Sequence, residues 1–168
     1  MSKQSEKEAI ANIILPFKEA QQIASQHGWN NIIQPGLVKE MIIADILGHQ
    51  VHKTKHEPDA FEYGNPEIGY EYLTCNNNKG SFQIDRFFKS PPAKKASSMA
   101  RITRNKAIYC VIFDAKNSLD VLEIIEIDID SFVIEVERQL SESSNDISHI
   151  GVPIKWARNN GKVVFVQS

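Results

Sequence analysis

The chain has 168 residues, of which 42% are hydrophobic and 24% are charged, and its net charge at pH 7 is −2. A chain of this length predicts a single domain, which would bury about two-thirds of the surface that its unfolded form exposes. It contains no apolar run as long as a membrane span and no basic and then apolar leader, so we expect a cytoplasmic protein without a membrane segment. Cys75 and Cys110 lack the spacing of a zinc site and are expected to be buried thiols.

The first part of the chain is predicted to be helical. Ser5 and Glu8 have the spacing of a capping box, and the helix that they open should be kinked or split at Pro16. A second helical piece is expected over residues 18–27. Both pieces carry apolar residues and precede the other predicted elements.

The next predicted helix ends at Gly48 and carries an acid among apolar residues. These apolar residues stand three, four and seven positions from Glu40, so its carboxylate should lie on the face turned toward the core. A buried acid needs a partner, because burial of an unpaired charge is costly. Glu40 is therefore a candidate site residue.

Two more acids follow in short predicted segments. The expected elements are, in order, a strand around Val51, a short segment that begins at Asp59, a turn over residues 64–66 and a strand over residues 70–75. The last strand contains Glu71. Three carboxylates that converge at a sheet edge suit Mg²⁺, which takes oxygen ligands and bridges to a substrate phosphate. We therefore expect a Mg²⁺ site formed by Asp59 and Glu71, with Glu40 assisting.

The middle of the chain combines irregular structure with positive charge. Residues 76–97 contain Pro91 and Pro92 and predict a long irregular segment, which in a compact domain is more often functional than not. Residues 79–106 carry many Lys and Arg against the single acid Asp85, whereas the charged residues of 114–146 are mostly acids. This separation predicts a positive surface that engages phosphates.

The second half predicts regular structure. The expected elements are strands over residues 107–113 and 121–127, a helix that Asp130 caps, and strands over residues 152–156 and 163–166 joined as a hairpin around Asn160 and Gly161. The predicted fold class is α/β, with a mixed central β-sheet flanked by α-helices.

The order of the acids resembles that of the PD-(D/E)xK nucleases, and most of all the PvuII-type restriction endonucleases. The matching residues span most of the chain in the same order: Ala24, Ser25, Gln26, His27, Gly28, Asn30, Ile32, Gln34, Gly48, Asp59, Ala60, Tyr70, Glu71, Tyr72, Lys79, Gly80, Phe82, Asp146, Ile147, Pro153, Ile154, Lys155, Gly161 and Lys162. The resemblance implies a restriction-endonuclease-like core in one nuclease domain over residues 1–168. It also implies a homodimer, for which residues 1–34 are the candidate interface.

The implied function is that of a type II restriction endonuclease. Such an enzyme hydrolyses phosphodiester bonds of double-stranded DNA at a short palindrome and depends on Mg²⁺, which Asp59 and Glu71 would bind. A nuclease that recognises DNA structure during repair is an alternative.

One position departs from the family motif, which has lysine two residues after the second acid. This chain has Leu73 there, and leucine can neither transfer a proton nor bind a phosphate. Three explanations are open. The lysine comes from elsewhere, with Lys79 first among the candidates and Lys55 and Lys39 after it; the metal acts with little help; or the protein binds DNA without cutting it.

The residues that would contact DNA are polar and follow the predicted catalytic strand or match the family near the C-terminus. They are Gln34, Asn76, Asn78, Lys79, Ser81, Gln83, Asp85, Arg86, Ser148 and His149. Asn and Gln read adenine, Arg reads guanine and Asp reads cytosine. His49, His52 and His56 lack cysteine or carboxylate partners at zinc spacing, so we interpret them as an exposed basic segment.

Overall fold

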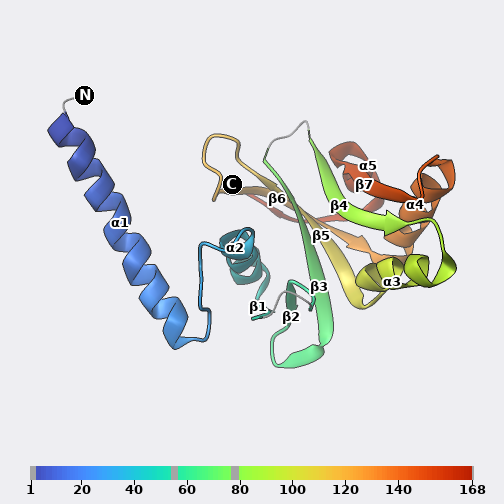
Figure 1. Ribbon diagram of the computed structural model, residues 1–168, viewed down its shortest axis with the longest axis horizontal. Helices are drawn as coiled ribbons and strands as arrows, with labels where there is room; N and C mark the ends of the chain where they lie inside the picture. Colours follow the sequence, from blue (N-terminus) through green and yellow to red (C-terminus); the bar gives the residue numbers. More distant parts are fainter. Residues whose placement is uncertain (1–2, 54–56, 77–79, 168) are drawn as a thin grey trace. The chain divides into compact units, whose positions relative to one another are not determined.

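The computed structural model describes residues 3–53, 57–76 and 80–167. It contains two compact units, Met1–Lys39 and Glu40–Ser168, and the boundary falls inside helix α2 (Leu37–Leu47). The fold is mixed α/β, with five helices and a six-stranded mixed sheet in the described part of the chain (Figure 1). None of the described helices combines the length and apolar character that a membrane crossing requires.

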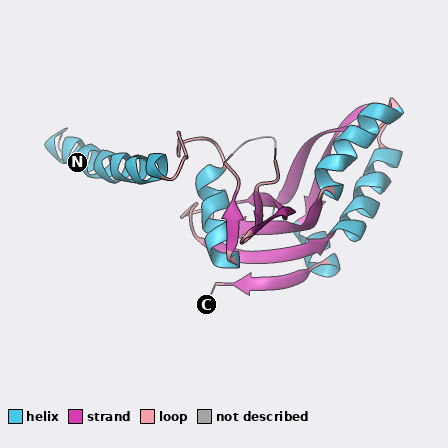
Figure 2. Ribbon diagram, turned by 90° about the horizontal axis from the view of Figure 1, so that it is seen from below, coloured by secondary structure: helices cyan, strands magenta, loops and turns pink. Residues whose placement is uncertain are grey.

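The larger unit holds both sheets. After α2 its elements are β1 (His49–Val51), β2 (Ala60–Glu62), β3 (Asn65–Cys75), β4 (Ser81–Phe88), α3 (Pro92–Thr103), β5 (Asn105–Phe113), β6 (Val121–Asp128), α4 (Ile129–Glu142), β7 (Ile147–Pro153), α5 (Ile154–Asn160) and β8 (Lys162–Val166). The central sheet has the order β1-β2-β3-β5-β6-β8, and β4 pairs with β7 in a separate two-stranded ribbon (Figure 2). Strands β3 and β5 are parallel and α3 lies in the connection between them, whereas the other pairs are antiparallel.

The main core lies between the central sheet and the elements α3, α4, α5, β4 and β7. Strand β5 alternates its side chains across the sheet, so Ile108, Cys110 and Ile112 face this core. Helix α4 contributes its apolar stripe, which includes Phe132 and Val136. This packing fixes the central strands, and with them the segments that carry the predicted acids.

The predicted irregular segment over residues 76–97 is wrong for most of its length. Strand β4 occupies its middle and α3 begins at Pro92, a position where proline fits the first turn of a helix. The alternation that would have revealed β4 is broken, because Ile84 pairs with Ile150 and Phe87 with Ser148. Two β4 residues therefore oppose one β7 residue in a β-bulge.

The predicted C-terminal hairpin is also wrong. Residues 154–160 form α5, so Asn160 and Gly161 end a helix instead of joining two strands; β7 pairs with β4, and β8 pairs with β6. The amide of Asn160 donates to the carbonyl of Trp156 at 2.9 Å and satisfies the helix end. A side chain at Gly161 would lie 2.7 Å from the backbone oxygen of Glu126, so glycine permits the close approach to β6.

Helix α4 begins two residues earlier than predicted. Its N-cap is Asp128, not Asp130, because the side chain of Asp128 accepts a hydrogen bond from the backbone N–H of Ser131 at 2.9 Å.

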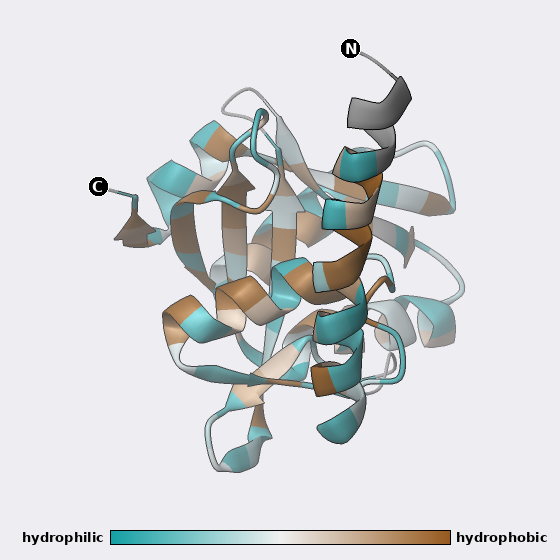
Figure 3. Cartoon of the chain, turned by 90° about the vertical axis from the view of Figure 1, so that its left-hand side faces the viewer, coloured by the Kyte–Doolittle hydropathy of each residue, from teal (hydrophilic) through white to brown (hydrophobic). Residues whose placement is uncertain are grey.

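The smaller unit consists mainly of α1 (Lys3–Gln26), which is one continuous helix. Of the two outcomes predicted at Pro16, a kink or a split, the split is wrong, because the helix continues through the proline. Gln21 fixes the segment that follows: its side-chain oxygen accepts from the N–H of Ile32 at 3.0 Å, and its amide donates to the carbonyl of Asn30 at 3.2 Å. Figure 3 shows hydrophobic residues along this helix, which begins at the N label.

Candidate active site

Asp59, directly before β2, and Glu71, within β3, are neighbours across the β2–β3 pairing. Ala60 pairs with Tyr70 in the antiparallel register, so the residue before Ala60 lies beside the residue after Tyr70. The Asp59 carboxylate accepts a hydrogen bond from the backbone N–H of Tyr72 at 2.8 Å. The order of acids along the sequence therefore becomes a pair of carboxylates in space.

A glycine makes this proximity possible. Gly69 lies in β3 and pairs with Phe61 of β2, and a Cβ atom built on it would lie 2.5 Å from Cγ of Pro58, in the segment before β2. Real Cβ atoms do not approach ring carbons so closely, so any larger residue would displace Pro58. Because Pro58 directly precedes Asp59, Gly69 controls where the first acid lies.

Burial raises the pKa values of both acids, and the charge of Asp59 adds to the rise at Glu71. Burial, followed by the negative charge of Asp59, raises the pKa of Glu71 to about 8. Burial also raises the pKa of Asp59, although the Tyr72 N–H and the charge of Arg104 oppose the rise. Two carboxylates in such a place favour either a shared proton or a bound cation.

Glu40, the third predicted acid, is electrostatically coupled to Glu71. It lies half-buried in the first turn of α2, and its charge contributes to the raised pKa values of Glu71 and Tyr72. Its contribution to Glu71 is smaller than that of Asp59. The electrostatic coupling thus connects all three predicted acids, with Asp59 and Glu71 as the closest pair.

The acid pair fits a hard cation. Glu71 Oε2 is buried and has no hydrogen-bond partner among the described residues, so one oxygen in the site is unsatisfied. Residues 3–53, 57–76 and 80–167 contain no group of three or more His, Cys, Asp or Glu placed to hold a metal together. Mg²⁺ does not require such a group, because it commonly binds through one or two carboxylates and completes its shell with waters.

Two arginines face the acids, and their role at this site was not foreseen. Arg104 Nη2 lies 3.9 Å from Glu71 Oε2, and the charges of Arg104 and Arg101 both lower the pKa of Glu71. The sequence placed both residues only in a general phosphate-binding surface. The signal that could have located them is their position just before β5, the parallel neighbour of the strand that carries Glu71.

Leu73 is a core residue. Its side chain is only 6% exposed and belongs to the main core, which also includes Phe82 and Ile84 of β4 and Ile102 of α3. Two of the three candidates for a relocated lysine, Lys79 and Lys55, lie outside the described residues. The third, Lys39, lies in α2 at the end of the smaller unit.

Several of the predicted DNA-contacting residues meet at the bulge of the β4–β7 ribbon. Gln83, Arg86 and His149 are exposed, and His149 is the β7 residue opposite the bulge. Arg86 has a φ of 60°, which is unusual for a residue other than glycine and is typical of a bulge that redirects a side chain. The structure therefore places Arg86 and His149 together although their residue numbers differ by 63.

The other predicted contacts have different settings. Ser81 Oγ accepts from the amide of Gln83 at 2.6 Å, and Ser148 shares a 2.7 Å hydrogen bond with Ser143, so both hydroxyls have partners within the protein. Asn76 is exposed just after β3. Gln34 belongs to the smaller unit. The predictions for Asn78, Lys79 and the side chain of Asp85 lie outside what the structure describes.

Part of the predicted basic surface is used within the protein. Lys95 forms a 2.6 Å ion pair with Glu137, and Lys89 donates to the backbone oxygen of Ser143 at 2.8 Å. Lys94 lies 5.5 Å from the centre of the Phe88 ring. Lys89 and Lys95 thus join the segment around α3 to α4.

The expectation that His49 belongs to an exposed basic segment is wrong. It is half-buried, its ring stacks on Tyr70 at 4.0 Å, and its Nδ1 forms a 2.7 Å hydrogen bond with the Tyr72 hydroxyl. Burial lowers its pKa. His52 packs edge-on against Phe61, and His56 lies outside the described residues. Both cysteines are free thiols; the predicted burial is confirmed for Cys110, whereas Cys75 is only partly buried.

Comparison of the chain with models of protein families and with curated proteins finds no match.

Proposed function

We propose that the protein is a Mg²⁺-dependent endonuclease that cleaves double-stranded DNA at a short palindrome. The observation that carries the proposal is the half-buried pair Asp59 and Glu71, whose raised pKa values and unsatisfied oxygen favour a bound cation. The order α2, β1, β2, β3, β4, α3, β5, in which β4 leaves the central sheet and β3 and β5 are parallel neighbours, supports a restriction-endonuclease-like core around these acids.

In this proposal Asp59 and Glu71 hold the metal, and Glu40 adds negative charge beside them. Mg²⁺ would polarise the scissile phosphate and neutralise charge that develops there. The Tyr72 N–H fixes the direction of the Asp59 carboxylate, so this ligand needs little rearrangement when a metal binds. Arg104 and Arg101 bring positive charge to the same place.

The β4–β7 ribbon is proposed to read the bases. A two-stranded ribbon fits the major groove, and the exposed side chains of Gln83, Arg86 and His149 offer donors and acceptors there. The opposite side of the ribbon is anchored by Phe82 and Val152, both fully buried. A rigid support of this kind suits the direct reading of base edges.

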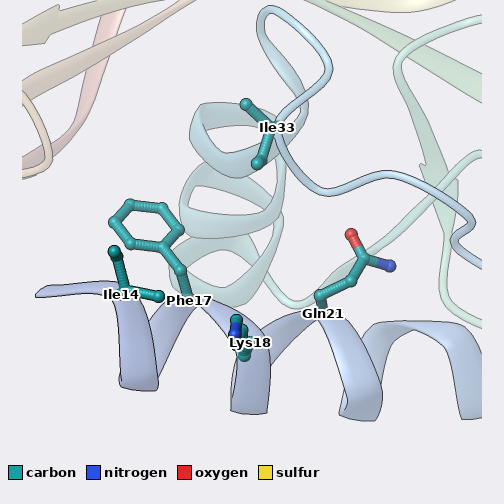
Figure 4. A pocket seen from close by; sticks show the side chains of 5 residues that line it. All are labelled: Ile14, Phe17, Lys18, Gln21 and Ile33. Atoms are coloured by element: carbon teal, nitrogen blue, oxygen red, sulfur yellow. The ribbon is translucent and has the colours of Figure 1, made fainter. Parts of the chain in front are cut away.

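A homodimer is proposed to form through α1. The helix exposes apolar side chains at the spacing of one helix face, among them Ile10, Ile13, Ile14 and Phe17. A pocket of about 570 Å³ on this unit is lined by Ile14, Phe17, Lys18, Gln21 and Ile33 (Figure 4). A second copy would cover this apolar surface and present one site to each DNA strand.

A DNA-binding protein without cleavage activity is the second candidate. The observation that favours it is Leu73, because the core fills the position of the family's lysine. The two candidates share the binding surface and differ only in the chemical step.

The test is incubation of the purified chain with plasmid DNA and Mg²⁺, with EDTA as the control. Discrete bands that need Mg²⁺ support the proposed function. Cleavage restricted to branched or flapped DNA would favour a nuclease that recognises structure. Specific retention of a DNA fragment with no cleavage in Mg²⁺ or Mn²⁺ would select the silent binding protein. Glu67→Gln serves as a matched control for variants of Glu71, since Glu67 is an exposed acid of the same strand.

A further inference from the structure

The acids of the proposed nuclease lack the lysine that the family places two residues after the second acid, and the structure offers a cation from another element. We propose that Arg104 binds the scissile phosphate beside Asp59 and Glu71 and does the electrostatic work of the missing lysine. This inference rests on the proposed function, and its test separates the two.

The position of the guanidinium is the first argument. Arg104 Nη2 lies 3.9 Å from Glu71 Oε2, and the Arg104 side chain is 35% exposed. The distance is longer than that of a close charge-assisted hydrogen bond, about 2.7 to 2.9 Å. The group is therefore adjacent to the acids and still open to solvent, which is the arrangement that a phosphate contact needs.

The backbone holds Arg104 at this place. Arg104 is the C-cap of α3, and its N–H donates to the carbonyl of Ala100 at 3.1 Å. The amide of the buried Asn105 donates to the carbonyls of Arg101 at 2.8 Å and Ile102 at 3.1 Å, and so closes the end of the helix. Asn105 then opens β5 opposite Gly69 of β3. The junction between α3 and β5 thus carries Arg104 to the strand of Glu71.

The chemistry of arginine defines what Arg104 can do. A guanidinium stays protonated at any physiological pH, so Arg104 cannot act as a proton-transfer group as lysine can. It can form two parallel hydrogen bonds to a phosphate and stabilise charge that develops in the transition state. Arg101, three residues earlier, lies 5.6 Å from the centre of the Phe87 ring and adds positive charge from the same helix end.

The experiment compares Arg104→Ala and Arg104→Lys with Arg158→Ala as the control. Arg158 suits this purpose because its side chain is 42% exposed and it forms an ion pair with Glu123, which is not one of the predicted acids. Single-turnover cleavage with Mg²⁺ gives the chemical rate. Affinity for the same DNA is measured over a range of salt with Ca²⁺ in place of Mg²⁺. Its salt dependence reports on phosphate contacts independently of cleavage.

Arg104→Ala is expected to lower the cleavage rate by about 100- to 1,000-fold, as loss of a positioned donor does. It should also reduce the slope of log affinity against log salt concentration by about one, the value for one lost phosphate contact. Arg104→Lys should retain part of the rate, and added guanidinium should partly restore Arg104→Ala. Arg158→Ala should match the wild type. If Arg104→Ala does not fold, Arg104→Gln replaces it, because its longer side chain keeps more of the packing.

The inference is overturned if folded Arg104→Ala or Arg104→Gln cuts at the wild-type rate and keeps the wild-type salt slope. If the wild type itself cuts no DNA, the proposed nuclease function fails instead. The salt slope then decides about Arg104 alone: a loss relative to Arg158→Ala supports the phosphate contact, and an unchanged slope refutes it.

Discussion

Replacement of Glu71 by glutamine should stabilise the metal-free protein at high pH. Glutamine keeps the shape of the side chain and removes its charge, and the charge is what burial and Asp59 disfavour. The pKa of Glu71 rises from its ordinary value of 4.5 to about 8 in the folded state. The folded protein therefore holds this proton more tightly than the unfolded chain, and stability is lost as the pH rises from 4.5 to about 8.

The size of this stabilisation follows from the rise in the pKa of Glu71 from 4.5 to about 8. A tenfold change in proton affinity corresponds to about 1.4 kcal/mol, so the rise in pKa corresponds to roughly 5 kcal/mol at most. The amide also loses water in this partly buried place, which reduces the net gain. We expect Glu71→Gln to raise the free energy of unfolding by about 1 to 3 kcal/mol at pH 8.5 and by little at pH 4.5.

Urea unfolding in EDTA at the two pH values measures this difference, with Glu67→Gln as the control for loss of an exposed acid from the same strand. Mg²⁺ should then reverse the order, because a ligand at 100 times its dissociation constant stabilises the folded state by about 2.7 kcal/mol. Wild type should gain this stability and Glu71→Gln should gain little of it. Equal stability of wild type and Glu71→Gln at pH 8.5, or an equal gain at both pH values, would refute the reasoning.

Four further outcomes are expected. Asp59→Asn should abolish cleavage while preserving or tightening DNA binding in gel-shift assays, since it removes a negative charge near the phosphate. Arg86→Ala should lose about 1 to 3 kcal/mol of discrimination at one base pair, whereas Lys94→Ala should weaken binding to all sequences alike. Gly69→Ala should lower both stability and Mg²⁺ affinity, measured by calorimetry, because it moves the segment of the first acid. Leu73→Lys should destabilise the protein in thermal unfolding by about 3 kcal/mol or more, because it buries an unpaired charge in the core; a folded variant that cuts faster than wild type would show instead that the position accepts the family's lysine.

The sequence predicted the parts of the fold that depend on local pattern. The helix of Glu40, the strand of Glu71 and the strand of residues 107–113 were expected, because apolar periodicity reports directly on burial. Strand β4 was missed, since its bulge breaks the alternation at Asp85 and Arg86. An intact period of two would have made the strand visible.

The candidate site was predictable where its residues are close in sequence and share a motif. Asp59 and Glu71 meet through a short antiparallel pairing, whereas the sequence predicted only that their carboxylates converge at a sheet edge. Arg104 joins them only because β5 lies parallel to β3, a long-range pairing that no local pattern specifies. The end of α5 shows the same limit, because Asn160 and Gly161 fit a hairpin turn and a helix terminus equally well until tertiary contacts select one.

The crossover from β3 to β5 also constrains when the site can exist during folding. Asp59 and Glu71 lie in the antiparallel part of the sheet, but Arg104 reaches them only after the chain has passed through β4 and α3 and docked as a parallel neighbour. Closing so long a loop is slow compared with the formation of a hairpin. A nascent chain that has folded only through β3 would therefore present two mutually repelling acids and no guanidinium, and would lack the positive charge that the proposed function assigns to the phosphate.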